Sequence, residues 1–127
     1  MRTVIVIPTY NEKDNLGRLA QSIQGQNDQV DILFVDDNSP DGTGRLAEAL
    51  SRDNPRINVL HRAAKEGIGR AYQEGFRWAL DERYDVIMQM DGDLSHDPQA
   101  IPEFLDKIQS YDAVFGSRYY KGVRVYN

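Results

Sequence analysis

Short apolar runs and longer amphipathic stretches alternate along this chain. Five runs rich in Val and Ile are apolar at successive positions, which is typical of strands buried on both faces of a sheet. The predicted strands are residues 3–7, 31–35, 57–60, 85–90 and 112–115.

Between these runs, apolar residues recur at spacings of three and four, which gives a helix one buried face. The predicted helices cover residues 16–23, 68–80 and 101–108, with a shorter one over residues 46–50. Strict alternation of strand and helix implies right-handed crossovers and a parallel sheet covered on both faces. The prediction is therefore an α/β, Rossmann-like domain with a mostly parallel sheet flanked by helices. Its ligands are expected beyond the carboxyl ends of the strands.

Composition narrows the classes of protein to consider. A chain of 127 residues with 40% hydrophobic content suits one compact domain. Fifteen Lys and Arg against twenty Asp and Glu give a net charge of -5, which argues against nucleic acid as a partner. Cys is absent, so a metal would be held by oxygen or His. No apolar run approaches the ~20 residues that span a bilayer, and we expect a soluble domain.

Asp91, Gly92 and Asp93 close the fourth predicted strand and form the sharpest chemical signal in the sequence. In extended backbone, side chains two positions apart point the same way, so both carboxylates are expected to face one ligand. Gly92 has no Cβ to obstruct close approach. Oxygen ligands at this spacing suit Mg²⁺ or Mn²⁺, with a diphosphate completing the coordination shell. An acidic turn that caps the next helix is the alternative, and it explains Asp97 better.

A second acidic pair, Asp36 and Asp37, ends the second predicted strand. Residues 38–43 are typical of a tight turn with a helix cap, which accounts for Asp41. An acid just past a strand of this fold commonly accepts hydrogen bonds from a base or a ribose. Asp37 is therefore a candidate ligand for a nucleoside.

Two other strand ends carry polar residues. The first predicted strand runs into residues 8–12, and neither a glycine-rich dinucleotide motif there nor a P-loop sequence anywhere is present. Residues 65–69 enter the third predicted helix, where backbone N–H groups and one ammonium could bind an anion; a flexible helix entry is the alternative. His61 and His96 stand alone and are interpreted as structural or solvated.

Five segments of the chain, taken in order, resemble glycosyltransferase family 2, whose members have the GT-A fold. The segments are residues 6–12, 35–43, 65–69 with 71–72, 90–96 and 116–119. More narrowly, they are similar to the dolichol-phosphate and polyprenyl-phosphate mannose synthases, and the Asn-Ser-Pro-Asp-Gly and Asp-Leu-Ser-His strings favour that mannosyl branch. The resemblance covers essentially the whole chain.

The resemblance implies an inverting, metal-dependent transfer of mannose from GDP-mannose to a polyprenyl (dolichyl) phosphate. It makes Asp91 and Asp93 the ligands of Mg²⁺ or Mn²⁺, and it makes these two residues and Arg118 the catalytic residues. The residues expected to bind the nucleotide sugar are Pro8, Tyr10, Glu12, Val35, Asp37, Lys65, Asp91, Gly92, Asp93 and Arg118.

Two features depart from the family pattern. Gly92 stands where the family usually has Ala, and family members continue beyond this length with acceptor-side basic residues. We expect residues 1–127 to form a single, truncated nucleotide-sugar-binding domain. The full-length protein is expected in the cytoplasm at the cytosolic face of a membrane, with contact made peripherally or through a membrane subunit by segments absent here. The alternatives are a nucleotide-sugar-binding fragment without turnover, and a family 2 transferase that uses another sugar nucleotide or acceptor.

Two unrelated classes fit the sequence poorly. A Mg²⁺-dependent phosphohydrolase of this fold class places a nucleophilic Asp after its first strand, where this chain has Pro8 and Thr9. A receiver-type signalling module needs paired acids after the first strand and a Lys after the fifth, where this chain has Pro8 and then Arg118.

Overall fold

The computed structural model describes residues 1–116 and 123–126, and its helices and strands alternate as the sequence predicts. The elements are β1 (Thr3–Thr9), α1 (Leu16–Gln26), β2 (Asp31–Asp36), α2 (Thr43–Asp53), β3 (Ile57–His61), α3 (Ile68–Asp81), β4 (Val86–Gln89), the 3-10 helix η1 (Pro98–Ala100), α4 (Ile101–Lys107), β5 (Ala113–Gly116) and β6 (Val123–Tyr126). The α/β fold class is confirmed. Within the described ranges, no helix has the length and apolar character needed to cross a bilayer.

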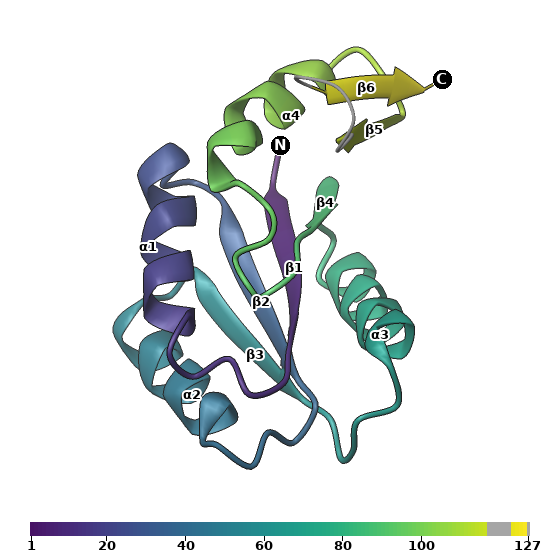
Figure 1. Cartoon of the computed structure of the whole chain (residues 1–127). Coiled ribbons are helices and arrows are strands. Elements are labelled where there is room, and N and C mark those ends of the chain that lie inside the picture. Colours follow the sequence, from purple (N-terminus) through teal and green to yellow (C-terminus); the bar gives the residue numbers. More distant parts are fainter. Residues whose placement is uncertain (117–122, 127) are drawn as a thin grey trace.

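The main sheet has four parallel strands in the order β3-β2-β1-β4. Strand β1 pairs with β2 on one side and with β4 on the other, so it lies at the centre. Thr9, Asp36 and His61 are aligned across the last register of β1, β2 and β3. The loops that follow these three strands gather at the lower edge of the molecule in Figure 1. The carboxyl ends of the strands therefore form one edge of the domain.

The fifth predicted strand does not join this sheet, which corrects one expectation. Strand β5 pairs antiparallel with β6, a strand that the sequence analysis did not predict. A groove of about 820 Å³ lies between β4 and β5, with α4 along it. The pairing of this strand was predicted wrongly because an apolar run indicates that a strand is buried but not which strand it pairs with. An antiparallel neighbour joined by a short connection is as compatible with that run as a parallel one.

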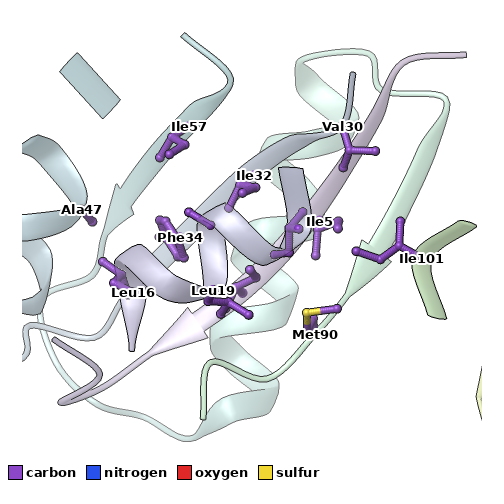
Figure 2. Close-up of a cluster of buried hydrophobic side chains, with 13 residues drawn as sticks. Ile5, Leu16, Leu19, Val30, Ile32, Phe34, Ala47, Ile57, Met90 and Ile101 are labelled. Carbon is purple, nitrogen blue, oxygen red and sulfur yellow. The ribbon is translucent and has the colours of Figure 1, made fainter. Parts of the chain in front are cut away.

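Two apolar layers hold the sheet between its helices. Alternate residues of β1 point to opposite faces, so Ile5 and Ile7 pack on the side of α1, whereas Val4 and Val6 pack on the side of α3. Figure 2 shows the first layer, in which side chains from α1 meet those of β1 and β2, and Figure 1 shows α3 alone on the other side. Gly75 lets α3 approach closely, because a Cβ there would lie 2.4 Å from Val6 Cγ1.

Candidate functional site

The loops after the strands contain unusual backbone. Asn11 after β1, Asn38 after β2 and Leu94 after β4 have positive φ angles of 56°, 57° and 65°. Residues other than glycine rarely adopt this left-handed conformation, and it costs free energy unless the surroundings hold it in place. Strained backbone of this kind concentrates at functional sites. Three of the four described non-glycine residues with positive φ thus lie in loops that follow strands; the fourth, Arg83, lies in the turn before β4.

The acidic loop after β4 differs from its predicted geometry. Strand β4 ends at Gln89, and Gly92 and Asp93 lie in a turn rather than in extended backbone. Gly92 is buried against the end of β1, where a Cβ would lie 3.0 Å from the Pro8 carbonyl oxygen and 3.5 Å from Glu12 Cγ. The absence of a side chain at Gly92 thus lets the acidic loop lie directly on the loop after β1.

Asp91 is held from two directions. The hydroxyl of Tyr72 on α3 donates a hydrogen bond to Asp91 Oδ1 at 2.8 Å. The backbone N–H of Asp91 donates to His96 Nδ1 at 3.1 Å, and His96 Nε2 lies 3.8 Å from Asp91 Oδ2. The sequence analysis interprets His96 as structural or solvated, whereas in the structure it contacts Asp91, a candidate site residue. Neither Tyr72 nor His96 was among the predicted site residues.

Asp93 is exposed and accepts hydrogen bonds from Ser95. Hydrogen bonds from the Ser95 hydroxyl and from the Ser95 backbone N–H, the latter at 2.9 Å, lower the pKa of the Asp93 carboxyl below its usual range. Burial raises the pKa of the Tyr72 hydroxyl above its usual range, and the hydrogen bond and charge of Asp91 and then the charge of Asp93 raise it further. Asp91 contacts Tyr72 directly, and Asp93 lies two positions further along the same loop.

This donor set fits a divalent cation that is shared with a phosphate ligand. Asp91 and Asp93 supply carboxylate oxygens, which Mg²⁺ and Mn²⁺ prefer. Across residues 1–116 and 123–126, no group of three or more His, Asp or Glu side chains is placed to hold a metal alone. Mg²⁺ is commonly bound through one or two carboxylates together with substrate phosphates, so two carboxylates suffice when a diphosphate is present.

Asp36 and Asp37, at the end of β2, have different partners. Asp36 is buried and accepts hydrogen bonds from the hydroxyls of Thr9 at 2.9 Å and Ser39 at 2.6 Å, so it ties the loops after β1 and β2 together. Asp37 is also buried, and its Oδ1 lies 2.9 Å from Arg62 Nη1. Asp37, which the sequence predicts to bind a nucleoside, is therefore already paired with the Arg62 guanidinium.

Arg62 is the centre of a charge cluster that the sequence analysis missed. Its side chain is 4% exposed and also contacts Glu66 at 3.4 Å and Glu74 at 3.2 Å. Burial lowers the pKa of the Arg62 guanidinium, but the hydrogen bond and charge of Asp37 and the charge of Glu74 outweigh burial, so the net shift is upward. The available signal was a cationic residue just past β3, beside the acidic pair at the next strand end.

The remaining predicted residues surround these two centres. Pro8 and Val35 are register partners on β1 and β2. The Lys65 ammonium lies 4.2 Å from the centroid of the Tyr10 ring, a cation–π contact between the loops after β3 and β1. Glu12 accepts a hydrogen bond from the Asn15 side chain at 2.8 Å. Of the predicted site residues, Arg118 lies outside the described residues.

Three other predictions can be compared with the structure. Asp41 accepts hydrogen bonds from the backbone and hydroxyl of Thr43, as predicted for a residue of the turn. Asp97 caps η1 by accepting from the Gln99 N–H at 2.9 Å, which confirms the predicted helix start. His61 pairs with Glu48 at 2.7 Å on the surface.

Comparison with known proteins identifies the family. The model of the family described as Glycosyl transferase family 2 matches residues 4–127. The chain belongs to glycosyl transferase family 2. This confirms the resemblance on which the sequence analysis relied.

Curated relatives of this family 2 chain include mannosyltransferases. It is 42% identical over 131 residues to the undecaprenyl-phosphate mannosyltransferase of Micrococcus luteus, covering 100% of this chain and 52% of that protein. It is 45% identical over 128 residues to the polyprenol monophosphomannose synthase of Mycolicibacterium smegmatis, covering 99% of this chain and 48% of that protein. The chain thus spans about half the length of these relatives.

Solved structures support the GT-A assignment of the fold. The Pyrobaculum calidifontis mannosyltransferase PcManGT, in complex with GDP-Man and Mn²⁺, superposes with a TM-score of 0.69 at 21% identity, over 82% of this chain and 31% of that one. Staphylococcus aureus TarS in complex with UDP gives a TM-score of 0.72 at 20% identity, over 91% of this chain and 34% of that one. At this identity the likeness is one of fold.

Proposed function

We propose that the protein to which this chain corresponds transfers mannose from GDP-mannose to a polyprenyl phosphate, with inversion at the anomeric carbon and with Mg²⁺ or Mn²⁺ as cofactor. The named relatives act on undecaprenyl or polyprenol phosphate and cover this chain end to end. The proposal carries the lipid phosphate, the sugar and the nucleotide over from those relatives and from the family resemblance.

The observation that carries the proposal is that Asp91, which accepts a hydrogen bond from Tyr72, and Asp93 share the loop that follows β4. A divalent cation bound there would offset the negative charge that develops on the leaving diphosphate. In this proposal Asp91 and Asp93 orient the diphosphate, and Gly92 lets the loop that carries them pack against the end of β1. Arg118 is proposed to bind phosphate through its planar guanidinium.

The nucleoside is proposed to lie at the ends of β1 and β2. Asp37 is held in place by Arg62 there, and Tyr10 and Lys65 border the same loops. A ribose or base hydroxyl or amine would donate to the Asp37 carboxylate, while Pro8, Glu12 and Val35 shape the floor. The buried ion pair favours a fixed carboxylate, and a fixed acceptor loses less entropy when a ligand binds.

The acceptor needs no general base in this scheme. A phosphate monoester with a second pKa of about 6 is already a nucleophilic anion at neutral pH. The difficulty is the approach of two phosphate groups, which costs several kcal/mol when their charge is not offset. Basic groups at the acceptor side are therefore required, and we propose that segments beyond this chain supply them at the cytosolic face of a membrane.

A second candidate is a nucleotide-sugar-binding fragment without turnover. It is favoured by the coverage, since the chain matches about half of the relatives' length. Residues 1–127 are expected to bind GDP-mannose and to transfer little or no mannose, whereas a full-length version transfers it. A family 2 transferase with another sugar nucleotide or acceptor is the remaining alternative.

Two measurements test these proposals. Calorimetry of GDP and GDP-mannose binding with Mn²⁺, with Mg²⁺ and with a chelator should show markedly weaker binding after chelation. Binding of equal strength without metal would refute the metal assignment. Transfer of radiolabelled mannose into polyprenyl phosphate is then compared between residues 1–127 and a full-length version, and equal turnover would show that the acceptor site is complete within this chain.

A further inference from the structure

We propose that Tyr72 is a positioning residue, which acts through Asp91 to orient that carboxylate toward the metal and diphosphate. This inference rests on the proposed function. It concerns a residue of α3 that the family motif does not mark as a ligand and that the sequence pattern assigns to the core.

Tyr72 lies on the face of the sheet that α3 covers, and its hydroxyl reaches the acidic loop. The residue is 9% exposed, and its ring packs against Phe76 at a centroid distance of 5.7 Å. The ring is thereby fixed within the apolar layer between α3 and the sheet. The hydroxyl emerges from this layer at Asp91 Oδ1, 2.8 Å away. A rigid helix therefore aims one neutral donor at one oxygen of the acidic loop.

His96 contacts Asp91 through the backbone N–H of Asp91. Because Nδ1 accepts the Asp91 backbone N–H, the ring proton of neutral His96 is on Nε2. That nitrogen faces Asp91 Oδ2 at 3.8 Å, longer than a hydrogen bond. The Tyr72 hydroxyl is thus the direct contact that fixes the rotation of the carboxylate, whereas His96 fixes the backbone beneath it.

The chemistry of the donor matters as much as its position. A Lys or Arg at this place would compete with a cation for the carboxylate, whereas a phenol donates one hydrogen bond and carries no charge at neutral pH. Each carboxylate oxygen also has a second lone pair, so Oδ1 can accept from Tyr72 and still face a metal. Partners of this kind typically change metal affinity by about 10–100-fold when they are removed.

The chain contains a matched control for the loss of a tyrosine hydroxyl. Tyr84 is also 9% exposed, and it donates a hydrogen bond to Asp31 Oδ2 at 2.6 Å. Asp31 begins β2, at the end of the sheet opposite to the site. Tyr72→Phe and Tyr84→Phe therefore remove the same group from a similarly buried bond with an Asp, one at the site and one far from it.

The experiment measures Mn²⁺-dependent GDP binding by calorimetry, GDP binding in chelator, and thermal unfolding for the wild type and both variants. Tyr72→Phe is expected to weaken Mn²⁺-dependent binding by about 10–100-fold and to leave binding in chelator unchanged. Tyr84→Phe is expected to bind as the wild type does, and both variants are expected to unfold at lower temperature. Equal Mn²⁺-dependent affinities for Tyr72→Phe and Tyr84→Phe would overturn the inference.

A double-mutant cycle separates positioning from a general loss of structure. In an Asp91→Asn background, Tyr72→Phe should have little further effect on Mn²⁺-dependent binding, because the carboxylate through which it acts is gone. Additive effects would overturn the inference. If wild-type binding does not depend on metal, the proposed function fails together with the inference; if it does and Tyr72→Phe binds normally, the inference alone fails.

Discussion

Replacing Arg62 by Met should destabilise the fold strongly, because the Asp37 carboxylate would stay buried without its counter-charge. The two side chains are 4% and 7% exposed and lie 2.9 Å apart. Breaking a buried pair by removing one partner costs about 3–5 kcal/mol. Glu66 and Glu74 lose a partner as well, but their side chains are half exposed, so water compensates most of that loss. The expected cost is a large share of the ~5–15 kcal/mol that stabilises a typical domain.

Urea unfolding of three variants near neutral pH tests this reasoning. Arg62→Met should lose about 3–5 kcal/mol, whereas Asp37→Leu combined with Arg62→Met should regain most of it, because two apolar side chains replace the pair. The double variant should nevertheless bind GDP weakly, since it lacks the Asp37 acceptor. Arg56→Met is the control: its partner Asp31 lies 3.0 Å away, but the Arg56 side chain is 38% exposed, and the loss should stay within ~1 kcal/mol. A similarly small loss for Arg62→Met would refute the view that the Arg62–Asp37 pair is shielded from water.

Two further predictions concern acidic and phenolic groups. Asp37→Ala should reduce GDP affinity, whereas Asp41→Ala should mainly lower the melting temperature, since Asp41 caps a turn; affinity and melting temperature are measured on both, and equal effects on both quantities would contradict the division. Burial, and then the hydrogen bond and charge of Asp31, raise the pKa of Tyr84 to about 12. The folded state therefore holds this proton more tightly than the unfolded state, whose tyrosines titrate near ~10. The stability that Tyr84 contributes is complete below pH ~10 and is lost as the pH rises through about 12. Unfolding measured over that window should show a smaller decline in Tyr84→Phe than in the wild type.

The helices and strands were predictable because buried positions appear in the sequence as a regular pattern of apolar residues. The continuous apolar run of β1 and the helical spacing of α3 are visible in the sequence, and the acidic loop follows β4 as expected. The partner of β5 was not predictable, because an apolar run carries no information about which edge it joins. The spacing of apolar residues along the chain does not show which strands pair with each other.

The site was less predictable than the fold for a related reason. Tyr72 falls on the buried face of α3, where its spacing is that of any core aromatic, and only its hydroxyl distinguishes it. Arg62 reads as an ordinary charge after a strand until the fold brings Asp37 beside it. His96 was set aside because it stood alone in the sequence, although its partner Asp91 is five positions earlier. In each case the chemistry depends on a contact through space.

The central position of β1 sets a distance as well as a topology. Asp37 follows β2 and Asp91 follows β4, and these strands flank β1 on its two sides. With neighbouring strands about 4.8 Å apart, the two acidic centres are separated by roughly 10 Å along the sheet edge. The spacing of the strands thus fixes the distance between the two acidic centres, and a ligand must span that distance to contact both. Under the proposed function, a nucleoside or a pyrophosphate alone would contact one acidic centre, whereas a nucleotide sugar would contact both.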